Sequence, residues 1–467
     1  MTDSYDLVVI GAGPAGEKAA THAAYFGART AIVERSRRVG GTAVSRGGIP
    51  SKTLRETALY ITGFRRRELY GVSASLDPTI ALDVLRHRAT GVVEGMTRLV
   101  ELNLGRHGID VVHGLAQIVA GPAVRIAGAD GSARTLHAGA ILVATGSRPF
   151  HPPGIPFDDP DVHDSDDLLA IRQPFGSILV IGGSAVGAEY ASIFTALGLR
   201  VTLVDVCPRL VPMLDSEISS LLAAAFTDMG MDLRLGRTAT TVGRFGDHPQ
   251  VTLDDGDILA ADKVLVAAGR AGNTEGLGLA EAGVQLDERG RIVVDANYHT
   301  TAEGVWAAGD VIGPPALASV AVEQGRRAAS HALRTAYHTV EPSPAPAGIY
   351  SIPEAAMIGL TEDEAKESGI DHVVGRGWFH SNARATIAGS TDGLVKLLVA
   401  PQSGRLLGVH IIGEIASELI HQGQAVLHFG GTVEYLAHTS FNVPTWGEAY
   451  RYAAFDALDR IERPPPR

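Results

Sequence analysis

The sequence has little of several residue types, and each shortage excludes a class of protein. A single cysteine, Cys207, occurs among 467 residues, so no intrachain disulfide can form and a disulfide-stapled secreted scaffold is excluded. The 40 Lys and Arg residues are outnumbered by 52 Asp and Glu residues, which argues against a strongly basic nucleic-acid-binding protein. Aromatic residues make up only 6% of the chain, whereas glycine, with 55 residues, is plentiful. This balance is typical of an α/β protein with many close backbone approaches.

Long apolar runs are also missing. No stretch approaches the roughly 20 apolar residues that a membrane helix needs. Asp3 and Asp6 stand where a signal peptide carries positive charge, and the apolar run after them is short. The 17 histidines show no ligand spacing with the cysteine or with a second acid, so no metal site is expected. We therefore expect a cytoplasmic protein that binds neither a membrane nor nucleic acid.

One glycine-rich segment occurs twice in the chain. Residues 5–34 read YDLVVIGAGPAGEKAATHAAYFGARTAIVE, and residues 176–205 read GSILVIGGSAVGAEYASIFTALGLRVTLVD. Each segment has an apolar strand, a glycine-rich turn, a helix of small residues and a second strand that ends on an acid, which is the pattern of a βαβ unit. The apolar strands are continuous, as expected of parallel strands buried on both faces. The sequence therefore predicts an α/β fold with two Rossmann-like dinucleotide-binding units.

The first repeat carries the complete fingerprint Gly11-x-Gly13-x-x-Gly16. One glycine makes the tight turn, one lets a pyrophosphate approach the backbone, and one lets helix and strand pack closely. The helix N-terminus adds partial positive charge, and Glu34 can accept hydrogen bonds from ribose hydroxyls. The cofactor contacts expected here are Gly11, Gly13, Pro14, Ala15, Gly16, Glu34 and Arg35.

The second repeat carries a degenerate copy of this fingerprint. Ser184 replaces the middle glycine, and Asp205 stands at the position that corresponds to Glu34. Serine is small and its own N–H can still face a phosphate, so we expect dinucleotide binding here too. The cofactor contacts expected in this repeat are Gly182, Ser184, Ala185, Val186, Gly187 and Asp205.

Asp205 makes the choice of nucleotide an open question. A carboxylate at this position bonds the 2′-hydroxyl of NAD, but at ~4 Å it would repel the 2′-phosphate of NADP by about 4 kcal/mol at an effective dielectric near 20. Arg209 follows four residues later, and Arg200 precedes the strand. Either arginine could swing in and neutralise the phosphate. The sequence alone therefore does not decide between NADH and NADPH.

Further strands followed by glycine turns extend the pattern to a family resemblance. They read VATGSRP (143–149), VAAGRAGN (266–273) and GVWAAGDVIG (304–313). Together with the two fingerprints and GGTAVSRGGIPSK (40–52), they resemble the pyridine nucleotide–disulfide oxidoreductase flavoproteins along essentially the whole chain. The resemblance implies FAD on the first unit, NAD or NADP on the second, and a homodimer.

The same resemblance implies a division of the chain. A proline-rich stretch, EPSPAPA (341–347), is the clearest linker. The expected domains are the first part of an FAD-binding domain (1–150), an NAD(P)-binding domain (151–272), a second FAD-binding or central part (273–340), and an α+β interface or dimerisation domain (341–467).

The chain departs from the family at its redox centre. The family places two redox cysteines where this sequence has Ala43 and Gly48, and a C-terminal histidine where it has Val443. Neither Ala43 nor Gly48 can form a thiolate, and Val443 cannot carry a proton. Electrons therefore cannot leave through a disulfide, which excludes lipoamide, glutathione and mercuric reductase activity.

Several stretches resemble one branch of the family, the soluble (Si-specific) NAD(P)+ transhydrogenases. They include IPSKTLRE (49–56), GAEYASIF (187–194) and AAGDVIGPPALAS (307–319). In that branch NADPH delivers a hydride to FAD, and NAD+ then collects it from the same site. Two alternatives stay open: an NAD(P)H diaphorase or quinone reductase, and a non-catalytic flavin-binding redox sensor.

The resemblance also implies roles for individual residues. Lys52 lies at the flavin N5 edge and pairs with Glu189, and Glu448 completes the site across the homodimer. From the residues alone, Lys52 could also be a solvated helix lysine and Glu189 a surface acid. Ala185 stands where some relatives have a gating tyrosine. The other implied contacts are Gly41 and Thr42 with the flavin or its phosphates, Ala116 with the adenine, Thr145 and Gly146 with the FAD pyrophosphate, Gly269 with the nicotinamide nucleotide, Asp310 with the ribityl chain and Ala318 with the pyrimidine carbonyl.

Overall fold

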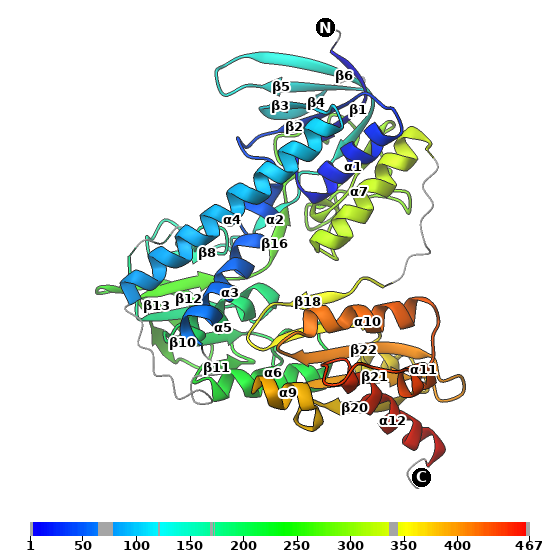
Figure 1. The fold of residues 1–467 in the computed structure, drawn as a ribbon. Helices are drawn as coiled ribbons and strands as arrows, with labels where there is room; N and C mark the ends of the chain where they lie inside the picture. The colour runs from blue at the N-terminus through cyan, green and yellow to red at the C-terminus, as the bar shows by residue number, and fades with distance from the viewer. Residues whose placement is uncertain are drawn as a thin grey trace.

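The computed structural model describes residues 3–63, 78–119, 122–168, 171, 173–335 and 344–463. These residues form two α/β units built on parallel strands and a C-terminal unit with an antiparallel sheet (Figure 1). The first three residues of the predicted linker at 341–347 lie outside the described residues. None of the described helices is long and apolar enough to cross a membrane.

The first unit is built on a seven-stranded sheet of β1 (Ser4–Ile10), β2 (Thr30–Glu34), β3 (Asp110–His113), β4 (Leu115–Val119), β5 (Ala123–Ala127), β6 (Ala133–Val143) and β17 (Val305–Ala307). The strands follow the order β3-β2-β1-β6-β5-β4, and β17 also pairs with β6. The strands β1, β2, β3, β6 and β17 are parallel, whereas β4 and β5 pair in an antiparallel manner. Helices α1 (Pro14–Tyr25) and α7 (Ala318–Leu333) pack side by side (Figure 1).

The second unit is inserted between β6 and β17 of the first. Its parallel sheet has the order β11-β10-β9-β15-β8, and its apolar strands are buried as the sequence predicts. Helices α5 and α6 follow β9 and β10, and a three-stranded antiparallel sheet, β12-β13-β14, precedes β15. The bounds are β8 Val162–Asp164, β9 Ser177–Ile181, α5 Ala185–Ala196, β10 Arg200–Asp205, α6 Ser216–Asp228, β11 Asp232–Leu235, β12 Ala239–Phe245, β13 His248–Leu253, β14 Ile258–Ala260 and β15 Lys263–Val266.

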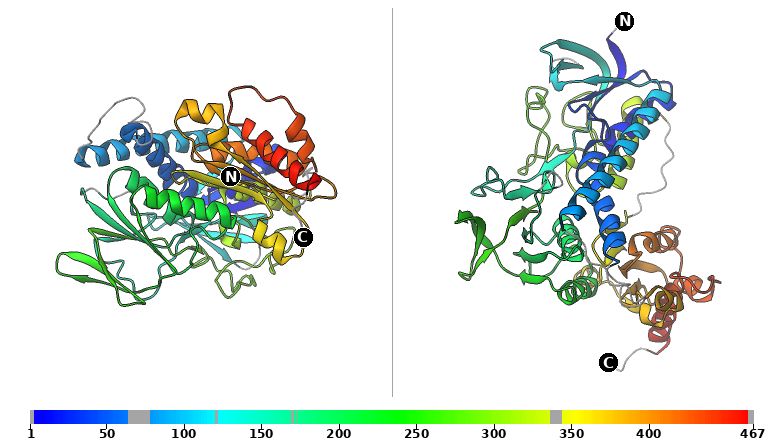
Figure 2. Two further views of the ribbon diagram at one scale, coloured as in Figure 1. Left: turned by 90° about the horizontal axis from the view of Figure 1, so that it is seen from below. Right: turned by 60° about the vertical axis from the view of Figure 1, so that its left-hand side comes forward.

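Two short strands join these units. β7 (Ser147–Pro149) and β16 (Arg270–Gly272) pair in an antiparallel manner, at the points where the chain enters and leaves the second unit. After α2 (Gly41–Ser45), helices α3 (Ile49–Thr62) and α4 (Pro78–Arg106) extend from the first unit toward the second (Figures 1 and 2). Helix α3 of the first unit contacts α5 of the second, so the two units pack against each other at this point.

The C-terminal unit is built on an antiparallel sheet in the order β18-β19-β22-β21-β20. Helix α12 packs on β20 and β21, and α10 packs on β19 and β22, which buries an apolar core between sheet and helices. The bounds are β18 Ala347–Ile349, β19 Glu354–Gly359, α8 Glu362–Glu367, β20 Val373–Trp378, α9 Ala383–Ala388, β21 Leu394–Val399, β22 Leu406–Gly413, α10 Ala416–His428, α11 Val433–His438 and α12 Glu448–Glu462.

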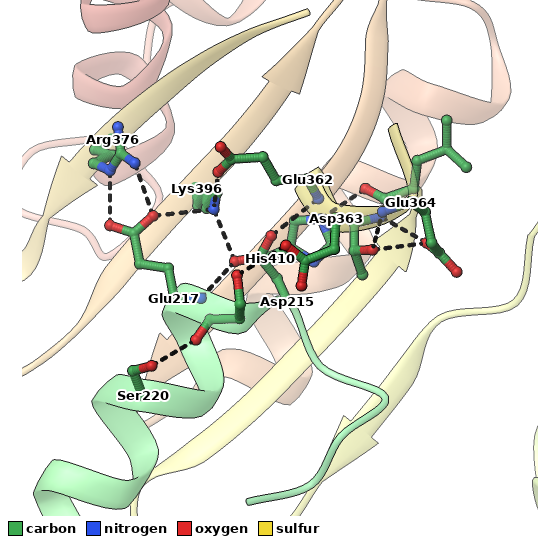
Figure 3. Close-up of polar contacts among 12 residues, drawn as sticks. Asp215, Glu217, Ser220, Glu362, Asp363, Glu364, Arg376, Lys396 and His410 are labelled. Atoms are coloured by element: carbon green, nitrogen blue, oxygen red, sulfur yellow. Dashed lines mark hydrogen bonds and ion pairs between the residues drawn. The ribbon is translucent and has the colours of Figure 1, made fainter. Parts of the chain in front are cut away.

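A buried cluster of charges ties the C-terminal unit to the second unit (Figure 3). The Lys396 ammonium on β21 lies 2.8 Å from Asp215, 3.0 Å from Glu217 and 2.7 Å from Glu362, and its side chain is fully buried. Arg376 on β20 forms two hydrogen bonds with Glu217. Asp215 and Glu217 begin α6 of the second unit, so these ion pairs hold the two units together. Breaking one partner of such a buried group leaves uncompensated charge, which is strongly destabilising.

Candidate active site between the two nucleotide-binding units

A cavity of about 1070 Å³ lies between the two parallel-sheet units. Its wall is formed by the β1–α1 turn, α2, the starts of α3, α5 and α7, and the segments around β7 and β16, and the C-terminal unit adds β18 and the start of α10. Loops at the carboxyl ends of parallel strands meet there, where α/β proteins usually bind their ligands. The predicted site residues that line the cavity are Gly11, Gly13, Pro14, Ala15, Glu34, Arg35, Gly41, Thr42, Lys52, Thr145, Gly146, Ala185, Val186, Glu189, Asp310 and Ala318.

In the β1–α1 turn the backbone approaches itself closely. Gly11 has a φ of 105°, and a Cβ there would collide with the carbonyl oxygen of Ala144. A Cβ at Gly16 would collide with the carbonyl oxygen of Gly11. At Gly13 a Cβ would meet the Cα of Gly41 at 3.8 Å, which is ordinary contact. The packing of the chain would therefore tolerate a side chain at position 13. The absence of one leaves the N-terminus of α1 open to an anionic group.

The second unit repeats this turn with one change. Gly182 has a φ of 111°, and a Cβ at Gly187 would collide with the carbonyl oxygen of Gly182. Ser184 is the N-cap residue just before α5, with φ −76° and ψ −174°, and Gly13 is the N-cap residue just before α1, with φ −75° and ψ −175°. The serine thus has the same unstrained backbone as the glycine, and its exposed side chain is the only difference at this position.

The two acids that end the second strands are held in the same way. Glu34 accepts hydrogen bonds of 2.8 Å from the backbone N–H groups of Ala12 and Ser36. Asp205 accepts hydrogen bonds from the N–H groups of Gly183 and Cys207, the latter at 2.6 Å. These donors occupy matching positions in the two repeats. Each carboxylate is fixed at the carboxyl end of its strand, where a ribose hydroxyl can donate to its remaining lone pairs.

Lys52 and Glu189 connect the two units across the cavity. The Lys52 ammonium on α3 lies 2.6 Å from the carboxylate of Glu189 on α5. The other oxygen of Glu189 accepts a 3.0 Å hydrogen bond from the backbone N–H of Tyr350, and the ammonium lies 4.9 Å from the centre of the Tyr350 ring. Burial raises the pKa of the Tyr350 hydroxyl. Glu189 is buried rather than a surface acid, and Lys52 is a paired rather than a freely solvated lysine.

Asp310 is held by a chain of polar groups that begins in the second unit. Its carboxylate accepts a 2.7 Å hydrogen bond from the Ser147 hydroxyl. Arg270 donates from Nε to the Ser147 hydroxyl oxygen at 2.7 Å and from a terminal nitrogen to the Ser147 carbonyl at 2.9 Å. Arg270 also lies 3.7 Å from Asp166. Sequence reasoning singled out Asp310 but missed Ser147 and Arg270, although both follow the glycine turns of two recognised segments.

Some predicted site residues do not line the cavity. Gly16 and Gly187 are packed within their turns, and Asp205 lies at the carboxyl end of β10, where it accepts a hydrogen bond from the Gly183 N–H. Ala116 lies on β4 and packs against the core of the first unit. Glu448 is buried at the start of α12 in the C-terminal unit. The predicted residues outside the cavity lining are Gly16, Ala116, Gly182, Ser184, Gly187, Asp205, Gly269 and Glu448.

The two arginines proposed to neutralise a phosphate at Asp205 lie elsewhere. Arg200 begins β10 and Asp205 ends it, so the two residues stand at opposite ends of the same strand. Arg209 forms a 2.5 Å ion pair with Asp363 of the C-terminal unit. The expectation that Arg200 could reach this phosphate is therefore wrong, and Arg209 already has a carboxylate partner.

The sequence matches two domains of one family of known proteins. Residues 5–325 match the pyridine nucleotide-disulphide oxidoreductases, and residues 345–454 match the dimerisation domain of the same family. The chain belongs to this family. The soluble pyridine nucleotide transhydrogenase of Mycobacterium tuberculosis (strain ATCC 25177 / H37Ra) is 41% identical over 458 residues, and that of Pectobacterium atrosepticum is 38% identical over 462 residues; each alignment covers 98% of both chains.

Solved structures of other proteins share this fold. LpdA from Mycobacterium tuberculosis superposes with a TM-score of 0.89 at 28% identity, covering 96% of this chain and 99% of that one. The HOCl-induced flavoprotein disulfide reductase RclA from Escherichia coli gives a TM-score of 0.87 at 28% identity, covering 97% of this chain and 99% of that one. The predicted fold class is thus confirmed.

The chain has no cysteine at the two positions, 43 and 48, where its resemblance to the pyridine nucleotide-disulphide oxidoreductases predicts the redox pair. Ala43 and Gly48 both line the cavity, and a Cβ at Gly48 would collide with the carbonyl oxygen of Ala43. The lone cysteine, Cys207, lies in the second unit, two residues after Asp205, and its backbone N–H donates to the Asp205 carboxylate. Val443, where the resemblance predicts the family's histidine, has 68% of its surface exposed and does not line the cavity. Positions 43 and 48 therefore supply no thiol to the cavity, and position 443 carries no imidazole.

Proposed function

We propose that this chain transfers hydride between NADPH and NAD+ through a bound FAD. The observation that carries the proposal is a single cavity that runs from the fingerprint of the first unit to the Lys52–Glu189 pair and has Ala43 and Gly48 in its wall. Without a thiolate beside the flavin position, a nicotinamide nucleotide is left as the hydride acceptor. The names of the two transhydrogenase relatives support this reading.

The first unit fits FAD in charge and shape. The N-terminus of α1, left bare by Gly13, would bind the pyrophosphate, the Glu34 carboxylate would bind the ribose, and the Asp310 carboxylate would bind the ribityl chain. When bound, FAD accepts the hydride of one nicotinamide and gives it to the next. The residues proposed to contact it are Gly11, Gly13, Pro14, Ala15, Gly16, Glu34, Arg35, Gly41, Thr42, Ala116, Thr145, Gly146, Asp310 and Ala318.

Lys52 and Glu189 are proposed to act as fixed charges. The ammonium of Lys52 stabilises negative charge that develops next to it, and Glu189 holds that ammonium in one position. Because the backbone of Tyr350 in turn fixes Glu189, the pair needs little rearrangement when a nucleotide binds. Ala185 beside them has a small side chain, which leaves room for the nicotinamide of a nucleotide held by Gly182, Ser184, Val186, Gly187, Asp205 and Gly269.

The dimerisation-domain match supports a homodimer. We propose that Glu448 of the partner subunit completes the site, since in its own chain Glu448 lies away from the cavity. A cytoplasmic location is proposed along with this, because the substrates are nicotinamide nucleotides and the chain has a single cysteine.

Two alternatives have less support. A quinone could replace NAD+ as the acceptor, or the flavin could serve as a sensor without turnover. Neither transhydrogenase relative is named for such an activity. Both alternatives are separated from the proposal by the experiment that follows.

Anaerobic stopped-flow absorbance tests the proposed function directly. NADPH should bleach the flavin band of the purified holoenzyme, and NAD+ added afterwards should restore it without any thiol compound. A flavin that NADPH does not bleach contradicts the proposal. Bleaching that a quinone reverses much faster than NAD+ identifies the quinone reductase, and a flavin that neither NADH nor NADPH reduces identifies the sensor.

A further inference from the structure

The proposed function requires the second unit to bind two nucleotides that differ in charge. The same site must bind NAD(H), whose ribose carries a 2′-hydroxyl, and NADP(H), whose 2′-phosphate is a dianion. Asp205 suits the first and repels the second. Arg200 lies at the far end of β10. Arg209 is held by a 2.5 Å ion pair with Asp363 and a 3.5 Å hydrogen bond to the Pro212 carbonyl, whereas Arg237 has a single, longer ion pair of 3.1 Å. A cation from another element must therefore stand beside Asp205 if NADPH is to bind well.

Arg237 lies next to Asp205 through strand pairing rather than through sequence. β11 runs parallel to β10, with Leu235 opposite Asp205, and Arg237 follows two residues after the end of β11. The backbone N–H of Arg237 donates a 2.9 Å hydrogen bond to the carbonyl oxygen of Asp205. This hydrogen bond fixes the Arg237 backbone against the residue that faces the ribose. A long arginine side chain at that place reaches the position of a phosphate on the ribose.

The present partner of Arg237 holds it only weakly. Its Nε lies 3.1 Å from the carboxylate of Asp255, and the two side chains are 47% and 27% exposed. Asp255 belongs to the turn between β13 and β14, which is fastened beside Arg237 by a 3.0 Å hydrogen bond from the Asp254 N–H to the Thr238 carbonyl. Exposed ion pairs of this kind contribute little, so a phosphate dianion can displace the carboxylate.

We propose that Arg237 binds the 2′-phosphate of NADP(H) by leaving Asp255 and turning toward the ribose beside Asp205. The inference rests on the proposed function, because it names the residue that lets one site accept both nucleotides. With NAD(H) bound, Arg237 stays on Asp255 and Asp205 accepts the 2′-hydroxyl. With NADP(H) bound, the guanidinium lies between the phosphate and Asp205 and screens their repulsion.

The test compares R237Q with D255N in the FAD-loaded enzyme. Dissociation constants for NADPH and NADH are measured from the concentration dependence of flavin bleaching, with adenosine 2′,5′-bisphosphate as an inhibitor that carries the phosphate alone. R237Q should weaken NADPH and adenosine 2′,5′-bisphosphate by roughly 10- to 100-fold and change NADH by less than about twofold. D255N, which frees Arg237, should strengthen NADPH by about threefold or more.

R234Q is the matched control, because Arg234 lies on β11, opposite Val204, and pairs with Asp232 and Asp257 rather than with Asp255. Its NADPH affinity should stay at the level of the unmodified enzyme. An unchanged NADPH affinity in R237Q, or an equal loss for NADH and NADPH, overturns the assignment. An unchanged NADPH affinity in D255N contradicts the proposal that Arg237 leaves Asp255 to bind the phosphate. If NADPH fails to bleach the unmodified enzyme, the proposed function itself fails, which is a distinct result.

Discussion

The two dinucleotide-binding units share one turn geometry but are enclosed differently. In the first unit, α7 closes over α1 so tightly that a Cβ at Gly325 would collide with the carbonyl oxygen of Ala15. In the second unit, α5 faces α3 of the first unit across the cavity, and α6 is fastened to the C-terminal sheet through Lys396. The first turn is therefore held by a helix of its own unit, whereas the helices of the second unit contact the neighbouring units. This difference suits a cofactor that stays bound in the first unit and substrates that exchange in the second.

The strongest test of the comparison makes the same substitution in both turns. Both G16A and G187A place a Cβ on a carbonyl oxygen, so each should distort its own turn severely. If the units have the proposed roles, purified G16A should contain little FAD, whereas G187A should keep its FAD and lose bleaching by either nucleotide. FAD content is read from the visible spectrum of the purified protein. Equal loss of FAD in both variants contradicts the division of roles.

The next test removes the charge that bridges the units. K52M should slow flavin bleaching roughly a hundredfold while leaving FAD bound, because a fixed ammonium beside the reacting atoms is lost. K18M is the control, since Lys18 pairs with the neighbouring Glu17 and does not line the cavity. Stopped-flow rates at saturating NADPH measure the effect. A K52M rate within about threefold of the control contradicts a role in catalysis.

A pH titration tests how the second unit is fastened. Burial on its own would raise the pKa of Glu362, but the ion pairs with Lys366 and Lys396 outweigh it and lower the pKa to about 2 from the usual 4.5 of a glutamate. The folded state therefore binds this proton less readily than the unfolded state. The resulting stability is complete above pH 4.5 and is lost as the pH falls toward 2, by the order of 2 kcal/mol.

Thermal unfolding between pH 5 and about 2.5 measures this loss, and E362Q is the comparison. The variant lacks the titrating carboxylate, so its unfolding temperature should fall less steeply with decreasing pH than that of the unmodified chain. Parallel curves for the two proteins would show that Glu362 does not contribute to the acid sensitivity.

The smallest expected effect concerns the one residue that differs between the turns. S184G should strengthen nucleotide binding by only about two- to threefold, because the serine backbone already has the conformation of Gly13. G13S in the first unit should reduce FAD content more clearly, since its hydroxyl would enter the space kept for the pyrophosphate. Dissociation constants from bleaching titrations and FAD content measure the pair. A large gain in S184G would show that the serine obstructs the phosphate.

Features that depend on local sequence could be predicted without the structure. The two turns and their acids were predictable because a strand, glycines, a helix and an acid at fixed spacing specify one geometry. The expectation for Arg200 failed because nearness in sequence is not nearness in space: five strand residues place it about 16 Å from Asp205. The family resemblance supplied the Lys52–Glu189 pair, which joins residues far apart in the chain.

Other contacts had no local signal. Arg237 reaches Asp205 through the pairing of β10 with β11, and the Ser147–Arg270 contact forms through the pairing of β7 with β16. In the apolar strand LVKLLV, a lysine argues against a fully buried β-strand. Lys396 is buried there because carboxylates that are distant in the sequence, such as Asp215, pair with it. Such long-range pairings follow from the packing of whole units, which single-sequence patterns do not encode.

The close approach of Gly48 to Ala43 limits which side chains this loop can carry. A Cβ at position 48 would collide with the carbonyl oxygen of Ala43, so any residue other than glycine requires the loop to shift. Cysteines substituted at positions 43 and 48 would therefore not fit the present backbone. An engineered thiol–disulfide exchange activity would need a change of the main chain as well as of these two side chains.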